Sequence, residues 1–195
     1  MNSAASDVRG AVLWITGLPG SGKTTVSLDV KKILENDYRS VVWLDGEDLR
    51  KVYRVHGGFD SASRLEIGRM TLRLCSLISS SGHIVLLSAV GLFGELHDAA
   101  RDSGSVWHIV NLEARREVRT SRTARLGKEV YRNSSDVEGV FDTGLRFDDS
   151  YTNNGGMPPR AIARMIASNF VERLESEGLS LKKSAIPGIP GVPAQ

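Results

Sequence analysis

The sequence predicts an α/β fold in which a parallel sheet is flanked by helices. Short apolar runs alternate with amphipathic stretches along the chain, and the runs are continuous enough to be strands buried on both faces. Strands that are joined through helices form right-handed β–α–β units, which place the strands parallel. The predicted strands are Ala11–Thr16, Ser40–Leu44, Ile84–Leu87 and Val106–Leu112.

Helices are expected where apolar residues recur at spacings of three and four. The last of them is expected to begin at Pro159, because proline suits the first helical turn. The earlier predicted helices span 23–36, 63–80, 93–101 and 113–126.

The segments between and beyond these elements define the expected domain. Residues 127–159 are polar, with glycines and acidic patches, which predicts a long loop or lid. Residues 1–10 resemble a flexible leader, and 181–195 alternate Pro and Gly as a flexible tail does. We therefore expect one domain over 11–180.

Composition narrows the class of protein. The 195 residues include 25 Lys and Arg against 23 Asp and Glu, a net charge of +2 that requires neither nucleic acid nor an anionic membrane as partner. The single cysteine, Cys75, excludes an internal disulfide and a cysteine-based zinc site. The apolar run Ala11–Ile15 is too short for a signal or membrane segment. We expect a cytoplasmic protein without a membrane span.

The motif between the first strand and the first helix is G-x-x-x-x-G-K-[ST], the P-loop. Its glycines let backbone N–H groups turn inward around a phosphate, at the positive end of the following helix. Lys23 would neutralise the outer phosphates, and the Thr24 hydroxyl would join the shell of a Mg²⁺ ion. The motif predicts a P-loop fold that binds a nucleotide with Mg²⁺, and other features must decide among a kinase, a GTPase and a motor. The predicted ATP-binding residues here are Gly17, Leu18, Pro19, Gly20, Ser21, Gly22, Lys23, Thr24 and Thr25.

An acidic turn follows the second strand and contains Asp45, Glu47 and Asp48. Strand ends in such sheets face the ligand crevice, where carboxylates can hold Mg²⁺ or accept a proton from an attacking hydroxyl. We predict Lys23, Asp45 and Glu47 as catalytic residues and Thr24 with Asp45 as the metal site. Asp48 is better explained as a cap of the next helix.

Two absences separate the classes of P-loop protein. The third strand ends at Ser88 without an acid, and the chain has no N-K-x-D guanine-reading motif. Both disfavour a motor or a GTPase.

A basic stretch leads into the expected lid. For most of its members a solvated basic face is the better explanation, but Arg122 is predicted to bind ATP. The stretch consists of Arg115, Arg116, Arg119, Arg122, Arg125, Lys128 and Arg132.

Together these motifs resemble adenylylsulfate kinase, a P-loop kinase that phosphorylates the ribose 3′-hydroxyl of adenosine 5′-phosphosulfate. WITGLPGSGKTT is similar to the family's W-x-T-G-L-S-G-[SA]-G-K-[ST]-T, and LDGEDLR to its L-D-G-D-x-[LVI]-R. The resemblance covers Val12–Tyr151, and it implies that Arg50 and Arg64 grip the acceptor's anion, that Phe59 stacks on its base and that Arg122 lies near the adenine of ATP. Many kinases of this type have a fifth strand before the last helix, which the sequence does not reveal.

The departures from the family pattern cluster on the acceptor side. Glu47 stands where the family has its catalytic aspartate, and the acceptor motifs change at Ile67 (for Asn), Met70 (for Arg), Gly91, Leu92 and Gly94. We therefore expect a roomier and more apolar acceptor pocket. The expected function is ATP-dependent transfer of phosphate to a hydroxyl of an anion-bearing, nucleotide-like small molecule.

Several alternatives stay open at this point. One is adenylylsulfate kinase proper, in sulfate assimilation. Others are a non-catalytic nucleotide-binding protein and a nucleic-acid kinase, which the near-neutral charge disfavours. A homodimer is one option for the oligomeric state.

Overall fold

Strands and helices alternate as the sequence predicts, except that a helix that was not predicted, α2 (Gly46–Val52), precedes α3 (Ser61–Ser80). The computed structural model describes residues 10–38, 40–53, 60–125, 141–179 and 181. In chain order the elements are β1 (Ala11–Thr16), α1 (Lys23–Asp37), β2 (Val41–Asp45), α2 (Gly46–Val52), α3 (Ser61–Ser80), β3 (Ile84–Ser88), α4 (Gly94–Arg101), β4 (Val106–Glu113), α5 (Arg116–Arg125), β5 (Asp149–Thr152) and α7 (Pro159–Ser176).

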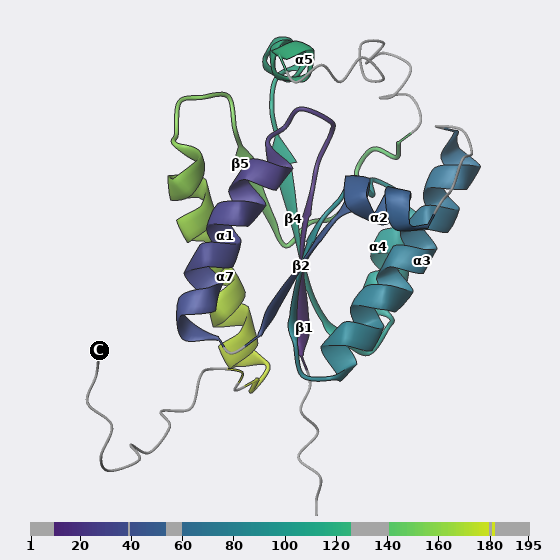
Figure 1. Ribbon diagram of the computed structural model, residues 1–195, viewed down its shortest axis with the longest axis vertical. Helices are drawn as coiled ribbons and strands as arrows, with labels where there is room; N and C mark the ends of the chain where they lie inside the picture. The colour runs from purple at the N-terminus through teal and green to yellow at the C-terminus, as the bar shows by residue number, and fades with distance from the viewer. Residues whose placement is uncertain (1–9, 39, 54–59, 126–140, 180, 182–195) are drawn as a thin grey trace, which may run out of the picture.

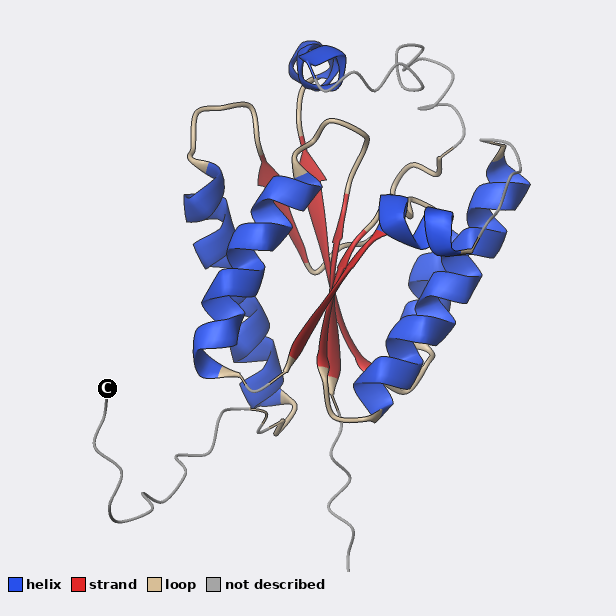
Figure 2. Cartoon of the chain, in the orientation of Figure 1, coloured by secondary structure: helices blue, strands red, loops and turns tan. Residues whose placement is uncertain are grey.

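The five strands form one sheet in the order β2-β3-β1-β4-β5, and each neighbouring pair is parallel. Helices α1 and α7 cover one face, and α2, α3 and α4 lie on the other, with α5 beyond the carboxyl ends of the strands (Figures 1 and 2). The predicted α/β fold with a parallel sheet is confirmed. Because β1 lies at the centre, the loop that follows it opens in the middle of the sheet's carboxyl edge.

The core has two layers, one on each face of β1. Leu13 and Ile15 pack toward α1 and α7, and Val12 and Trp14 pack toward α3 and α4. All four are at most 1% exposed. A strand buried on both faces explains the uninterrupted apolar run in the sequence.

The second strand was predicted to be buried, and here the prediction is wrong. β2 is an edge strand, and all five of its residues are only partly buried. An apolar run such as SVVWL is equally compatible with a half-covered edge, because sequence alone does not show whether a second neighbour exists.

The prediction of an irregular lid over 127–159 is also wrong for part of its length. Asp149–Thr152 form β5 at the other edge of the sheet, and this is the fifth strand that the sequence did not reveal. Its run DSYT contains one aromatic residue and no aliphatic one, so it lacks the pattern of a strand. Residues 126–140 lie outside the described part of the chain.

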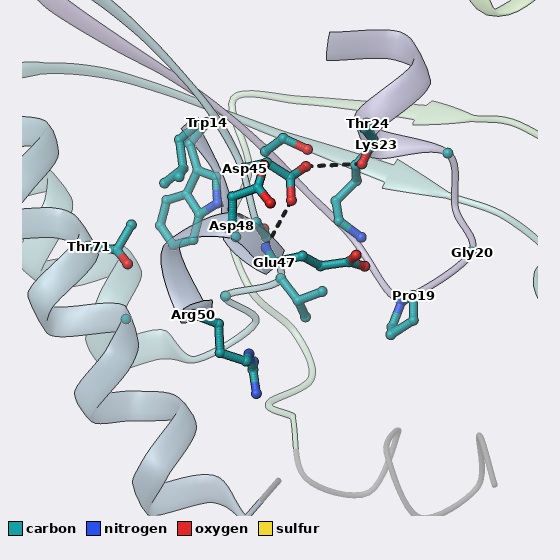
Figure 3. Close-up of a pocket in the computed structure, with 18 of the residues that line it drawn as sticks. Trp14, Pro19, Gly20, Lys23, Thr24, Asp45, Glu47, Asp48, Arg50 and Thr71 are labelled. Carbon is teal, nitrogen blue, oxygen red and sulfur yellow. Dashed lines mark hydrogen bonds between the residues drawn. The ribbon is translucent and has the colours of Figure 1, made fainter. Parts of the chain in front are cut away.

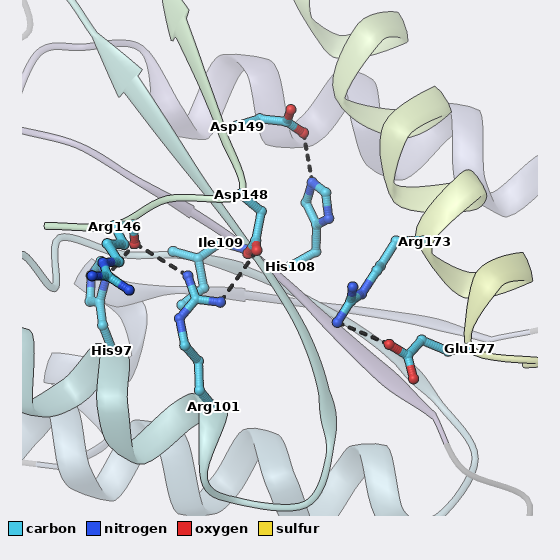
Figure 4. A network of polar contacts seen from close by, with 9 residues as sticks. All are labelled: His97, Arg101, His108, Ile109, Arg146, Asp148, Asp149, Arg173 and Glu177. Carbon is cyan, nitrogen blue, oxygen red and sulfur yellow. Dashed lines mark hydrogen bonds and ion pairs between the residues drawn. The ribbon is translucent and has the colours of Figure 1, made fainter.

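Polar contacts fix the segment that leads into β5 (Figure 4). Asp148 accepts a hydrogen bond of 2.7 Å from the Ile109 N–H and pairs with Arg101 at 3.3 Å. Asp149 accepts a hydrogen bond of 2.7 Å from His108, whose ring packs against the Phe170 ring. Side chains on β4 and α4 therefore hold a polar strand in place that its own sequence does not favour.

The two ends of the chain depart from expectation at single residues. Gly10 was assigned to a flexible leader, but it is buried and its N–H donates to Ser79 O at 2.8 Å. Leu181 was assigned to the tail, but it packs against the core. Residues 1–9 and 182–195 lie outside the described part. Among the described helices, none is long and apolar enough to cross a membrane.

Candidate active site

A cavity of about 750 Å³ opens at the carboxyl ends of β1, β2 and β3. This is the edge at which α/β sheets bind ligands. We call one side the P-loop end, lined by Gly20, Gly22, Lys23, Thr24, Arg122 and Asn153, and the other the α3 end, lined by Arg50, Arg64, Ile67, Thr71, Gly91 and Phe141. Figure 3 shows the P-loop and α3 on opposite sides of the acidic turn.

The P-loop glycines are needed for contacts outside the loop as well as for its curvature. Gly17 and Gly20 have φ of 139° and 80°, a region that side chains rarely adopt. A Cβ on Gly17 would lie 2.3 Å from the Leu112 carbonyl oxygen, and one on Gly20 would lie 2.6 Å from that of Arg119. Backbone atoms at the end of β4 and in the first turn of α5 therefore pack directly against the glycines of the loop.

Lys23 and Thr24 begin α1, where both line the cavity. The Lys23 ammonium donates to the carbonyl oxygens of Gly17 (2.7 Å) and Leu18 (3.0 Å), so the lysine folds back over its own loop. The Thr24 hydroxyl donates to Asp45 Oδ2 at 3.1 Å (Figure 3). The predicted pair of metal ligands thus meets across 21 residues of sequence.

The residue that caps the helix after the acidic turn is not the one predicted, Asp48. Asp45, not Asp48, is the N-cap of α2, and its Oδ1 accepts a 2.8 Å hydrogen bond from the Glu47 N–H. Asp48 instead pairs with Lys51 at 2.7 Å. Both Asp45 oxygens are therefore held by the protein. Glu47 extends from α2 toward the P-loop (Figure 3).

Arg122 approaches the P-loop from outside, as part of α5. Its guanidinium nitrogen Nη1 lies 3.4 Å from Gly20 O and 3.3 Å from Ser21 O. Thr25, the other predicted ATP-binding residue beyond the motif, lines the cavity beside Thr24. The contact of Arg122 with the loop agrees with a place at the nucleotide.

The rest of the basic stretch is divided. Arg119 is 6% exposed and its Nε donates to Ala114 O at 3.0 Å, so it is not part of a solvated face. Arg115, Arg116 and Arg125 are exposed as predicted. Lys128 and Arg132 lie outside the described residues.

Sequence reasoning missed Asn153, which lies in the loop after β5. It is 3% exposed, lines the cavity and donates from Nδ2 to Ser21 O at 2.8 Å. The contact spans 132 residues of sequence. No motif or spacing connects the two positions, so no signal in the sequence pointed to it.

The α3 end joins two cations to an apolar surface. Arg64 is only 7% exposed, and its guanidinium carbon lies 5.4 Å from the centroid of the Phe141 ring, a cation–π distance. Arg50, in the last turn of α2, lines the same cavity. Phe59, the third residue predicted for this end, lies outside the described residues.

The expected apolar character of this end is present, and a pocket roomier than the family's stays a prediction, although Gly91 itself adds no room. Ile67 is 8% exposed and lines the cavity. A Cβ on Gly91 would lie 2.1 Å from the Trp14 ring, so the indole already fills that space. Met70 and Gly94 are not among the described residues that line the cavity, and the Gly94 N–H donates to Asp142 at 2.7 Å.

Comparison with known proteins agrees with this geometry. The family model described as adenylylsulphate kinase matches residues 9–152 of the 195. The chain belongs to the adenylylsulfate kinase family. The resemblance indicated by the motifs is confirmed, and the protein is a kinase, an ATP-dependent phosphotransferase.

Within the adenylylsulfate kinase family, similar relatives differ in their named acceptors. The chain is 26% identical to cytidine diphosphoramidate kinase of Campylobacter jejuni over 90% of this chain and 96% of the relative. It is 27% identical to adenylyl-sulfate kinase 3 of Arabidopsis thaliana over 87% and 84%. Family membership therefore does not by itself decide the acceptor.

Solved structures agree on the fold. The Mycobacterium tuberculosis APS kinase CysC, determined in complex with AMPPNP and APS, has a TM-score of 0.70 at 24% identity, over 86% of this chain and 98% of that one. At this identity the likeness supports the fold alone. The relatives named here are kinases of small molecules, so the non-catalytic binder and the nucleic-acid kinase are not favoured.

Proposed function

We propose that this kinase transfers the γ-phosphate of ATP to a hydroxyl of an anion-bearing, nucleotide-like acceptor other than adenylyl sulfate. One observation carries the proposal: the α3 end keeps the two arginines, Arg50 and Arg64, but presents buried Ile67 where the family pattern has asparagine. An apolar side chain cannot replace the hydrogen bonds of an amide. A sulfate group there would therefore lose a partner, while a phosphate reached by the arginines would not.

The P-loop end would hold ATP. The backbone N–H groups of the loop and the N-terminus of α1 favour a polyphosphate, and Lys23 supplies a point charge beside it. In the presence of ATP, Lys23 would exchange its bonds to the Gly17 and Leu18 carbonyls for phosphate oxygens. Arg122 would contact ATP near the adenine, on the side of the nucleotide that is distant from the acceptor.

The residues around Thr24 fit Mg²⁺. The Thr24 hydroxyl and the Asp45 carboxylate are adjacent oxygen ligands, and Mg²⁺ prefers one or two such groups together with phosphates and water. The Ser88 hydroxyl, which is buried and lines the cavity, has no hydrogen-bond partner among the described residues and could serve a bound water. The ion would supply charge neutralisation on the phosphates.

Glu47 is proposed to accept the proton of the attacking hydroxyl. Asp45 already accepts from Thr24 and from the Glu47 N–H, so its geometry suits a fixed ligand better than a proton acceptor. Glu47 is exposed to the cavity and extends between α2 and the P-loop (Figure 3). A hydroxyl held between the two ends would lie within its reach.

The acceptor's anion would lie between Arg50 and Arg64. A buried guanidinium stacked on Phe141 is held in one orientation, which favours a planar, bidentate contact with phosphate. Stacking of the acceptor's base on Phe59 stays a prediction. The relative from Campylobacter jejuni, whose name specifies a cytidine diphosphate derivative, supports an acceptor of this class.

Steady-state kinetics with ATP and two acceptors tests the proposal. We expect kcat/KM to be at least about tenfold higher for cytidine diphosphoramidate than for adenylyl sulfate, because each lost hydrogen bond to a charged group costs about 1.5–3 kcal/mol. A value above about 10⁴ M⁻¹s⁻¹ for adenylyl sulfate, ordinary for a native substrate, would contradict it.

Two further proposals concern the protein's setting. A cytoplasmic location agrees with the supply of ATP and with an intracellular acceptor. A homodimer is tested by light scattering of the purified chain, which separates the monomer mass of 21.2 kDa from twice that value.

A further inference from the structure

We infer that Asn153 is a positioning residue that orients the Ser21–Gly22 peptide of the P-loop, so that the Gly22 N–H faces the phosphates. This inference rests on the proposed use of the P-loop for ATP. It adds a residue outside the P-loop motif and the basic stretch to the donor site.

The backbone of Asn153 is itself fixed. Its N–H donates to Glu113 O at 2.7 Å, which ties the loop after β5 to the last residue of β4. The side chain is therefore presented to the P-loop from a strand end rather than from a free loop. At 3% exposure, loss of its hydrogen bonds would not be repaired by solvent.

The neighbours decide which way the side-chain amide faces. Ser21 O is an acceptor, so the Asn153 nitrogen must face it, at 2.8 Å. The Arg122 guanidinium is only a donor, so the Asn153 oxygen must face it, at 3.4 Å. The Asn153 amide thus donates a hydrogen bond to the P-loop and accepts one from α5.

This contact sets the direction of the next N–H group. In a planar trans peptide the C=O and the following N–H point in opposite directions. Because Asn153 and Arg122 both donate to Ser21 O, the Gly22 N–H points away from these two side chains. That N–H lies immediately before α1, where a phosphate binds.

Gly22 is adapted to the same contact. Its φ is 97°, and a Cβ at this position would lie 2.4 Å from the Asn153 side-chain nitrogen. The last glycine of the motif therefore leaves room for the Asn153 side chain, in addition to allowing the backbone turn.

The substitution Asn153→Asp tests the inference, with Asn154→Asp as matched control. The new carboxylate of Asn153→Asp would keep the acceptor for Arg122 but would place an oxygen against Ser21 O, which removes the donor and repels the carbonyl. At the neighbouring position, Asn154 Oδ1 accepts from the Arg115 N–H at 2.7 Å, and aspartate keeps that bond. Both variants add one negative charge to the same loop.

The readout is the affinity for ADP, measured by titration calorimetry in the absence of any acceptor. We expect Asn153→Asp to weaken ADP binding about tenfold or more and Asn154→Asp to change it less than about twofold. Equal affinity of Asn153→Asp and the unchanged protein overturns the inference. Equal weakening in both variants also overturns it, because added charge then explains the loss.

A second variant guards against misfolding. Asn153→Ala removes the donor without adding a charge, and we expect ADP binding several-fold weaker than normal together with faster hydrogen exchange in the P-loop peptide. Normal exchange and normal affinity in a folded Asn153→Ala protein would overturn the inference. Since no acceptor is present, failure here is separate from failure of the proposed acceptor class, which is measured through kcat/KM.

Discussion

The two ends of the cavity are built in different ways. The P-loop end consists mainly of backbone groups, shaped by glycines that contact β4, α5 and the loop after β5. The α3 end consists of side chains, with Arg64 stacked on Phe141 and Ile67 forming part of the apolar surface. A backbone site tolerates little change and keeps a recognisable motif, whereas a side-chain site can change its ligand by single substitutions. The donor can therefore be inferred from a motif and the acceptor cannot.

The largest expected effect is at the P-loop end. Lys23→Ala should reduce turnover to about 1% or less, since removing one electrostatic contact at the transferring group typically costs 10²–10³-fold. The unfolding midpoint should stay close to normal, because the Lys23 ammonium bonds to the Gly17 and Leu18 carbonyls of its own loop.

Lys31→Ala provides the matched control, because Lys31 lies on the same helix and forms a surface pair with Glu35 at 2.6 Å. Turnover of Lys31→Ala should be unchanged. Retention of more than a few per cent of activity in Lys23→Ala would refute the assignment of the donor end.

The carboxylates between the two ends come next. Glu47→Gln should lower kcat by about 10²–10⁴-fold with little change in the affinity for ATP, as expected for loss of a general base. Asp48→Asn should be nearly silent, because Asp48 pairs with Lys51 in solvent. If Asp45→Asn is severe while Glu47→Gln is silent, the base is Asp45 and Glu47 has a structural role.

A third substitution makes the α3 end of the cavity more polar. Ile67→Asn restores the residue of the family pattern and should raise kcat/KM for adenylyl sulfate by about tenfold. It should also lower the free energy of unfolding by about 1–3 kcal/mol, because it buries an amide in an apolar surface. Leu72→Asn, also buried on α3, should carry the stability loss without the gain in activity. A gain from both would speak against a specific role of position 67.

The smallest effect concerns pH. Burial lowers the pKa of His97, whose ring nitrogens lie 3.0 Å from Gly91 O and 3.4 Å from Arg146 O. The folded state then binds fewer protons than the unfolded one, so stability is full above the ordinary histidine pKa of about 6.5 and is lost as pH falls through and below it. His97→Asn should reduce this slope between about pH 7 and pH 5 in chemical unfolding. An unchanged slope would show that other groups cause it.

The predictions from the sequence were correct where a short local pattern of residues determines an element of structure. The apolar runs of β1 and β3 and the glycines of the P-loop are local signals, and they located the central sheet and the loop that follows its central strand. The polar strand β5 could not be found in this way, because His108 and Asn169 hold Asp149 from other elements.

The candidate site shows the same limit. Asn153 contacts the P-loop across 132 residues, which no local pattern encodes. The room at Gly91 was misjudged because the Trp14 ring, from a distant strand, fills it. Contacts between distant segments were the part that the sequence left undetermined.

The central position of β1 also has a consequence for biosynthesis. Both of its neighbours, β3 and β4, are made later, and β4 ends only at Glu113. A growing chain therefore carries an apolar strand with two open edges until β3 has been made, and with one open edge until β4 has been made. Strands that are so distant in sequence pair slowly during folding. The strand that precedes the phosphate-binding motif is thus synthesised before both of its sheet neighbours, and the motif acquires its shape only after β3 and β4 exist.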